Sequence, residues 1–346
     1  MANKNIKMHL ILSYKNLIFI SLLFFYISCK PNTGKNKLPD PTDSIANTLV
    51  VKELSIEIEK NPEDAELLYR RAQIYSNTKY LNRAEDDYLA AIVLDSINPL
   101  YHYQLGRTLY AMNQTQRAAK EFEKAILLKP DYFEASMKLA NLYFLVKEHA
   151  KSVAILNKCL QQDKANPETF HMLGMNYKEM GDTGRAIYHF QTAIENDPTD
   201  FESNLYIANL YAARKKVIAM DYFAAAIKLR PRAADAWFGR AVFEQSMGLY
   251  KSALKDYRKV IDIDPEHYLS YYNVGYLNFD LGMMDEALRN WNYCTQMNPG
   301  YAKAFYMKGL LFEEKGKKQD ARLNYKVALE LEPENELYIA GMQRLR

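Results

Sequence analysis

The sequence predicts an all-α fold in which about eight helix-turn-helix repeats stack side by side as a solenoid. Three observations support this prediction. A pattern of small and aromatic residues recurs every 34 residues along most of the chain. Each repeat holds two runs in which apolar residues recur at three- and four-residue steps, the period of an amphipathic helix. Glycine or proline separates many of these runs, and both residues end helices.

The pattern begins with a small residue, followed after twelve positions by a second small residue and four positions later by an aromatic one. The first small residue recurs as Ala72, Gly106, Ala140, Gly174, Ala208, Ala241, Gly275 and Gly309. The aromatic residues are Tyr88, Phe122, Phe190, Phe223, Tyr257, Trp291 and Tyr325. Leu156 replaces the aromatic residue in repeat three, and repeat five is one residue shorter. We therefore expect irregular stacking at these two repeats.

The repeat resembles the tetratricopeptide repeat, whose 34-residue signature is W-x₂-L-G-x₂-Y…A-x₃-F…P. Repeat four matches it closely with Leu173-Gly174 and Tyr177, then Ala186, Phe190 and Pro198. The resemblance implies a right-handed superhelical α-solenoid of eight units over residues 63–334. A single unit cannot cover its own apolar faces, so neighbouring units must stack.

Short helices are expected at both ends of the solenoid, over residues 45–62 and 335–346. Leu54, Ile56 and Ile58 alternate as in a strand, but the position of this segment before Asn61-Pro62 favours a helix. Both segments carry charged residues, which suits terminal caps that keep a solenoid soluble.

Residues 1–28 have the features of an export signal. Three lysines precede an apolar run of twelve residues, Leu17 to Ser28, which fits the apolar core of a signal peptide. The end of this run, Ser28-Cys29, resembles the cleavage site of bacterial lipoproteins. That resemblance implies that Cys29 becomes the N-terminus and carries the lipid. An uncleaved anchor helix from Leu10 to Ser28 and ordinary secretion are the alternatives.

Residues 29–44 contain three prolines and five charges without apolar periodicity, as expected of a flexible tether. Lys30, rather than an acid, follows Cys29; in some bacteria this favours sorting to the outer membrane. The resemblance thus implies a lipid-anchored protein of the cell envelope, on the outer membrane and facing the periplasm. Removing three leader lysines from 45 basic residues leaves 42 against 42 acids, so composition gives no reason to expect nucleic-acid binding.

No arrangement of residues indicates catalysis, a cofactor or a metal site. Thr33-Gly34-Lys35 lacks the other residues of a phosphate loop, and no G-x-S-x-G turn is present. The histidines are not spaced as zinc ligands. Cys159 and Cys294 are expected to be small buried residues. Arg240 and Glu244 are spaced to pair within one helical turn.

The tetratricopeptide resemblance places a partner-binding groove along the first helix of each repeat. Carried over position by position, it implies an aromatic and lightly polar surface that suits protein or peptide recognition. The candidate residues are Tyr69, Tyr103, Arg107, Tyr110, Asn141, Phe144, Asn209, Phe238, Tyr272, Tyr276, Phe279 and Tyr306. Leu269, Tyr272, Tyr276 and Phe279 are expected to form the densest exposed cluster. Packing between neighbouring helices is the alternative role for these side chains.

The function that follows is a membrane-tethered adaptor or scaffold, not an enzyme, which binds a protein or peptide partner of the cell envelope in its groove. One alternative is a structural subunit of a secretion or outer-membrane assembly, with contacts through the convex face or the ends. Another is a cell-wall glycan binder, because tyrosines stack on sugars.

Overall fold

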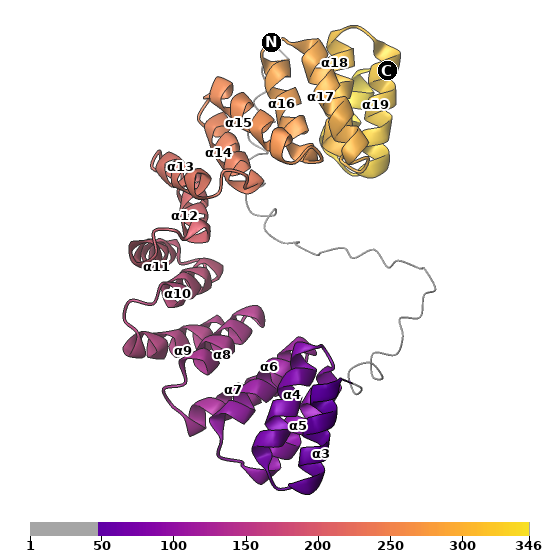
Figure 1. The fold of residues 1–346 in the computed structure, drawn as a ribbon. Helices are drawn as coiled ribbons and strands as arrows, with labels where there is room; N and C mark the ends of the chain where they lie inside the picture. Colours follow the sequence, from indigo (N-terminus) through magenta and orange to yellow (C-terminus); the bar gives the residue numbers. More distant parts are fainter. Residues whose placement is uncertain (1–47, 346) are drawn as a thin grey trace. The chain divides into compact units, whose positions relative to one another are not determined.

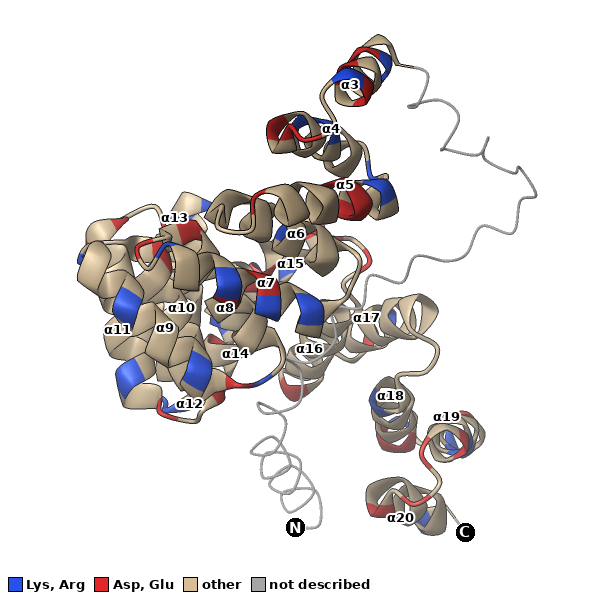
Figure 2. Ribbon diagram, turned by 90° about the horizontal axis from the view of Figure 1, so that it is seen from below, with Lys and Arg blue, Asp and Glu red and all other residues tan. Residues whose placement is uncertain are grey.

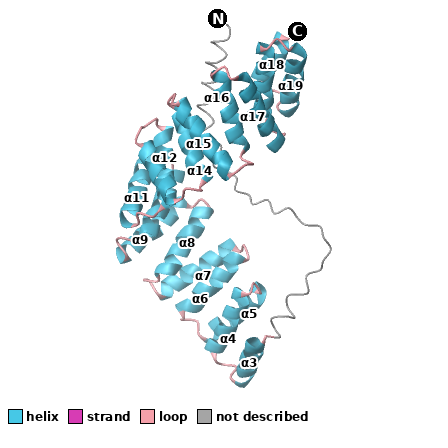
Figure 3. Cartoon of the chain, turned by 45° about the horizontal axis from the view of Figure 1, so that its top comes forward, coloured by secondary structure: helices cyan, strands magenta, loops and turns pink. Residues whose placement is uncertain are grey.

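The computed structural model describes residues 48–345, which form the eighteen helices α3 to α20 (Figure 1). Within this range the structure contains no strand (Figure 3). None of the helices in the described range is long and apolar enough to span a membrane. The leader and the whole of the tether, Cys29 included, lie outside the described residues.

The eight repeats are regular helical pairs. The first helices each have 13 residues: α4 Ala65–Asn77, α6 Pro99–Ala111, α8 Phe133–Leu145, α10 Pro167–Glu179, α12 Phe201–Ala213, α14 Ala234–Ser246, α16 Tyr268–Asp280 and α18 Ala302–Glu314. The second helices are α5 Leu81–Leu94, α7 Thr115–Leu128, α9 His149–Gln162, α11 Thr183–Asn196, α13 Ala219–Leu229, α15 Tyr250–Ile263, α17 Met284–Met297 and α19 Lys318–Leu331. The all-α solenoid prediction is confirmed.

The missing residue of repeat five affects its second helix. Helix α13 has 11 residues, whereas the other second helices have 14. Its aromatic residue, Phe223, is nevertheless completely buried. Leu156 is also completely buried in repeat three. Both repeats therefore keep the central contact between their two helices.

A further helix lies at each end of the described chain. Helix α3, Leu49–Lys60, packs on α4 and buries Val51 and Leu54, while Ile56 is half exposed. Helix α20, Glu336–Arg344, packs on α18 and α19. Arg344 makes a bidentate ion pair with Glu313, with both N···O distances at 2.9 Å.

The chain divides into two compact units, with the boundary between His189 and Phe190 inside α11. The described N-terminal unit contains α3 to α10 and the first part of α11. The C-terminal unit contains the rest of α11 and α12 to α20. Acidic and basic residues are scattered over the helices of both units (Figure 2).

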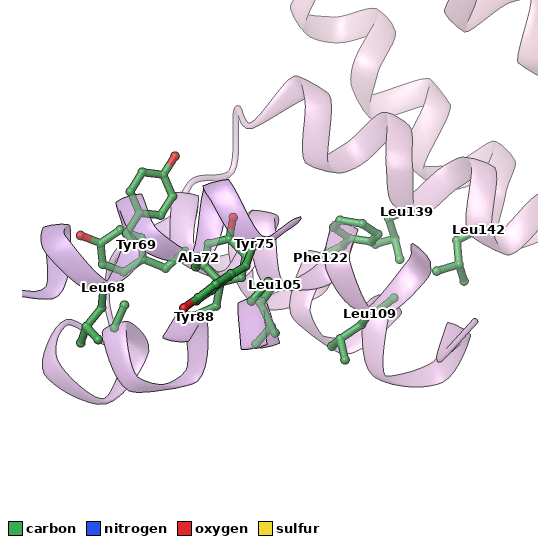
Figure 4. Close-up of a cluster of buried hydrophobic side chains, with 14 of the residues drawn as sticks. Leu68, Tyr69, Ala72, Tyr75, Tyr88, Leu105, Leu109, Phe122, Leu139 and Leu142 are labelled. Carbon is green, nitrogen blue, oxygen red and sulfur yellow. The ribbon is translucent and has the colours of Figure 1, made fainter. Parts of the chain in front are cut away.

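The core of each repeat is the contact between a small residue on the first helix and a large residue on the second. In the N-terminal unit Tyr88 and Phe122 belong to one buried cluster with Ala72 and Leu105 (Figure 4). A Cβ atom at Gly106 would lie 2.7 Å from the Phe122 ring, so only glycine lets these two helices approach so closely. The recurring pair of a small and a large residue in the sequence thus reflects how the two helices of a repeat pack.

The turn inside every repeat contains one residue in the left-handed conformation, seven positions after the first small residue. Four repeats place glycine there: Gly181, Gly248, Gly282 and Gly316. The other four place Lys79, Asn113, Lys147 and Lys215 there, with φ between 53° and 66°. A lysine Cβ is strained in this conformation, so the three lysine turns carry a cost that the glycine turns avoid.

Replacing Lys147 with glycine is expected to raise the free energy of unfolding of the N-terminal unit by about 0.5–1 kcal/mol, because it relieves this strain. The matched control is Lys158→Gly in the exposed face of α9, where glycine costs about 1 kcal/mol. Urea unfolding followed by circular dichroism measures both. A lower midpoint for both variants would contradict the strain argument.

The structure corrects the expected pairing of Arg240. Its guanidinium pairs with Asp256 on α15, at 2.6 Å and 3.1 Å, instead of with Glu244 on its own helix. Arg71 and Asp87 occupy the same two places in repeat one and pair in the same way. The Arg240 side chain reaches across to the second helix because the helices of one repeat are in close contact. Glu244 is left buried, with Oε2 unpartnered.

Burial raises the pKa of Glu244 to about 7, and the nearby charge of Asp256 adds to this effect, while Arg240 and Lys255 oppose it. The folded chain therefore binds more protons than the unfolded chain between about pH 4.5 and pH 7. Stability should fall by about 1–3 kcal/mol as the pH rises through this window.

Glu244→Gln should remove this part of the pH dependence and stabilise the C-terminal unit at pH 8. Urea unfolding at pH 5, 6, 7 and 8 measures the difference between wild type and variant. That comparison cancels the titration of His267, whose pKa is lowered by burial. Parallel stability curves for the two proteins would refute the assignment.

Candidate protein-binding surface

The candidate residues lie on the first helices of the repeats, and the structure sorts them by exposure. Arg107, Tyr110 and Asn209 are exposed. Tyr103, Asn141, Phe144, Phe238 and Tyr276 are half-buried. Tyr69, Tyr272, Phe279 and Tyr306 are buried. We call the exposed and half-buried members together the first-helix face, and describe its two parts separately for the two units.

The expected exposed cluster on α16 is wrong in two of its four members. Tyr272 and Phe279 are only 6% and 7% exposed, while Leu269 and Tyr276 are half-buried. Phe279 packs on the Trp291 ring with centroids 5.6 Å apart. The backbone carbonyl of Tyr272 accepts a hydrogen bond from the Trp291 indole at 3.1 Å. Phe279 is thus buried against Trp291, the largest aromatic residue of the repeat pattern, whereas the Tyr272 ring packs edge-on against Tyr301.

Several candidate rings join one repeat to the beginning of the next. The ring centroids are 5.1 Å apart for Tyr69–Tyr101, 5.0 Å for Tyr103–Tyr132, 4.8 Å for Phe238–His267, 5.1 Å for Tyr272–Tyr301 and 4.9 Å for Tyr306–Tyr338. Aromatic pairs at these distances stabilise packing beyond the area they bury. In both units, side chains at this position of the repeat thus help neighbouring repeats to pack on each other. The partner rings could have been found by their recurring spacing, roughly thirty residues downstream, which the sequence analysis did not use.

In the N-terminal unit the accessible part of the first-helix face centres on α6. Arg107 donates to Gln104 at 3.0 Å and its guanidinium lies 5.8 Å from the Tyr103 ring centroid. Among the described residues Arg107 forms no ion pair. Burial raises the pKa of Tyr103, and the positive charge of Arg107 partly offsets that rise. Arg107 and the exposed Tyr110 can therefore contact a partner without breaking an existing ion pair.

The next first helix, α8, adds Asn141 and Phe144. Phe144 packs edge-on against His149, with centroids 5.5 Å apart, so its ring is held in place while remaining partly exposed. The half-buried Asn141 carries both a donor and an acceptor, which a peptide backbone can use. Together with Arg107 and Tyr110 these residues form the accessible part of the face in this unit.

In the C-terminal unit Asn209 is the most accessible candidate. A Cβ atom at Gly239 would lie 3.3 Å from its side-chain oxygen and 2.7 Å from the Phe223 ring. Because Gly239 has no side chain, there is space beside it for the Asn209 amide. Gly239 was not among the predicted residues, although it departs from the repeat pattern as a second small residue two positions before Ala241. The half-buried Phe238 and Tyr276 lie on the next two first helices, α14 and α16.

Other reactive side chains are buried or dispersed. Cys159 and Cys294 are free and completely buried, as expected, and burial raises their pKa values to about 11 and about 12. Within residues 48–345 no group of three or more His, Cys, Asp and Glu side chains could hold a metal ion. The accessible first-helix face offers hydrogen bonding, aromatic contact and the Arg107 guanidinium, which forms no ion pair with a described residue.

An α-solenoid with a partly open first-helix face defines a class of repeat proteins. Comparison with known families shows to which family of this class the chain belongs. Two models described as tetratricopeptide repeat match residues 103–167 and 218–268, and residues 65–98, 167–200 and 302–335. Together these matches cover more than half of the chain. The chain belongs to the tetratricopeptide repeat family.

Relatives among characterised proteins are distant. The chain is 24% identical to human superkiller complex protein 3 over 243 residues. The match covers 58% of this chain and 16% of that protein. It is 23% identical over 235 residues to a DnaJ homolog subfamily C member 7 homolog of Dictyostelium discoideum, covering 68% and 39%. The chain thus spans well under half the length of these relatives, and the similarity lies in the repeats.

Solved structures show the same fold. The C-terminal part of a TPR repeat-containing protein from Cytophaga hutchinsonii aligns with a TM-score of 0.60 and 18% identity, over 69% of this chain and 99% of that one. A tetratricopeptide repeat protein from Parabacteroides merdae aligns with a TM-score of 0.52 and 16% identity, over 71% and 98%. At these identities the likeness establishes the fold alone.

Proposed function

We propose that this chain is a non-catalytic scaffold that binds an extended segment of a protein partner on its first-helix face. The observation that carries the proposal is the accessible set on α6 and α8: Arg107, Tyr110, Asn141 and Phe144. A rigid aromatic ring, an amide and a guanidinium without an ion pair combine apolar contact with hydrogen bonding, as protein-binding surfaces do.

We further propose that a lipid on Cys29 tethers the scaffold to a membrane of the bacterial cell envelope, on the periplasmic side of the outer membrane. The support is the leader sequence and the proline-containing tether of residues 29–44. Two acyl chains or more give stable anchoring, whereas one gives only reversible binding. Cys29→Ala should abolish labelling by a fatty-acid analogue and release the protein from membranes. Membrane attachment that persists without the label would contradict lipid tethering.

Crosslinking and capture from envelope extract, with residues 30–346 as bait, tests partner binding. The variant carries Arg107→Ala, Tyr110→Ala and Phe144→Ala, which all lie on the accessible face. The matched control carries Lys120→Ala, Leu127→Ala and Tyr188→Ala, at exposed positions of second helices. A partner held by the parent and the control but lost from the variant supports the proposal.

The same experiment separates the two alternatives. A partner lost only from the second-helix variant would favour a structural subunit that contacts its assembly through the convex face. Binding of purified protein to cell-wall glycan, reduced by Tyr110→Ala, would favour a glycan binder. The buried Tyr272, Phe279 and Tyr306 are unsuitable for any of these tests, because truncating them would loosen repeat packing.

A further inference from the structure

A row of exposed apolar side chains lies along one edge of the C-terminal unit. It is formed by the turns between the two helices of repeats five, six and seven, and we call it the turn edge. Its members are 38–67% exposed: Val217, Ile218, Met247, Leu249, Tyr250, Leu281 and Met283. Stacked repeats place equivalent turns side by side, and the helix pairs α12–α13, α14–α15 and α16–α17 follow one another in this order (Figure 1).

These apolar residues are not required by the turn itself. Leu249 and Met283 directly follow the left-handed glycines of their turns. In five other repeats the same place holds a polar residue: Gln114, Glu148, Asp182, Lys216 and Lys317. In repeat one it holds Tyr80, which is half-buried against Tyr75. Repeats six and seven therefore depart from the rest of the chain by exposing apolar side chains here.

At two of these turns the backbone faces open space. A Cβ atom at Gly248 or Gly282 would meet no other atom within 4 Å. A groove that binds a partner helix would need a concavity between elements. Projecting tips with an aromatic and several aliphatic side chains are instead suited to shallow insertion among lipid headgroups.

The charges around the turn edge complement an anionic surface. Arg214, Lys215 and Lys216 directly precede Val217, and Lys251 follows Tyr250; all four are exposed. Among the described residues these four form no ion pair. The two acids at the start of α17 are already paired, Asp285 with Lys315 at 2.6 Å and Glu286 with Arg289. The free charges nearest the apolar tips are therefore largely positive, and each such base favours binding to anionic lipid.

We propose that the turn edge binds the surface of an anionic lipid bilayer, with Leu249, Tyr250 and Met283 entering the headgroup region and the neighbouring bases contacting lipid phosphates. The contact is separate from the lipid on Cys29. It holds the C-terminal unit at a bilayer and leaves the first-helix face, on other parts of the repeats, accessible to a partner.

The test uses residues 30–346, which contain every described helix and lack Cys29. Co-sedimentation is measured with vesicles of phosphatidylcholine alone and of phosphatidylcholine with 30% phosphatidylglycerol. The chain should bind the anionic vesicles, and binding should weaken in high salt because the bases contribute. Leu249→Gln with Met283→Gln should lower the partition coefficient by about tenfold or more, since two apolar tips are lost.

Two further variants separate the apolar and electrostatic parts. Val93→Gln with Leu127→Gln makes the same change at exposed apolar residues of the N-terminal unit and should bind like the parent. Arg214→Gln with Lys216→Gln should weaken binding to anionic vesicles only. In a Tyr250→Trp variant, brominated lipid should quench the fluorescence of the tryptophan introduced at this position.

Absence of vesicle binding by the parent, or equal binding by the parent and the Leu249/Met283 variant, would overturn the proposal. The proposal would also be overturned if light scattering showed that the parent is a dimer, that the Leu249/Met283 variant is a monomer, and that neither binds vesicles. The turn edge would then be an interface between two copies of the chain. Capture of a protein partner through the turn edge without lipid binding would overturn it as well. None of these outcomes bears on partner capture by Arg107, Tyr110 and Phe144.

Discussion

Trp291→Ala is expected to lower the free energy of unfolding of the C-terminal unit by about 3–5 kcal/mol, the range for removing a large buried aromatic side chain. Trp291 is completely buried, packs on Phe279 and donates its indole N–H to the carbonyl of Tyr272. The substitution leaves a cavity between α16 and α17 and removes the indole hydrogen bond to the Tyr272 carbonyl. Urea unfolding monitored by far-ultraviolet circular dichroism gives the change.

The matched control is Tyr293→Ala on the same helix. Tyr293 is 49% exposed, so its truncation should cost less than about 1 kcal/mol. Equal effects of the two substitutions would show that burial against α16 is not what stabilises this repeat.

Gly275 provides a second test of the same contact. A Cβ atom there would lie 2.5 Å from the indole nitrogen, so Gly275→Ala must displace Trp291 from its hydrogen bond. Repeat three shows how a larger residue fits, because Ala140 is paired with Leu156 there and both are completely buried. Gly275→Ala combined with Trp291→Leu should therefore cost less than the sum of the two single changes. Strict additivity would mean that the two positions do not interact.

The sequence predicted the helical repeats because the signal is repeated eight times and each copy has the same physical cause. A small residue and a large one recur where two helices meet, so the spacing alone located Gly275 opposite Trp291. The exceptions had little effect, since Leu156 and the shortened α13 keep the same central contact. The lysines in left-handed turns were not predicted, because only glycine is an obvious sign of that conformation.

The candidate surface was only partly predictable. The resemblance located the first-helix positions, but whether such a side chain is exposed depends on what packs against it from the next repeat. Tyr272 and Tyr110 look alike in the sequence, yet Tyr272 packs edge-on against Tyr301 whereas Tyr110 is 41% exposed. Arg240 illustrates the same limit, since its partner is sixteen residues away on the second helix and not within its own turn.

The second large effect on stability is expected at the ion pair between Arg240 and Asp256. Asp256→Ala should lower the free energy of unfolding of the C-terminal unit by about 3–5 kcal/mol, because removing one partner leaves the other charge buried and unpaired. Asp256 has only 4% of its side chain exposed and Arg240 has 19%. The guanidinium also lies 4.9 Å from the Trp237 ring centroid, a contact that would not replace the lost carboxylate.

A matched control is Glu286→Ala, which breaks the Arg289 pair on the surface of α17. That pair is 66% and 38% exposed, so its loss should cost at most about 1 kcal/mol. Replacing both buried partners, Arg240→Met with Asp256→Leu, should recover most of the stability lost in Asp256→Ala, because no buried charge is then left without a partner. If the double variant is no more stable than Asp256→Ala, the cost arises from lost packing and not from the unpaired arginine. Arg71 and Asp87 make the same contact in repeat one, so the same pair of substitutions there should behave alike in the N-terminal unit.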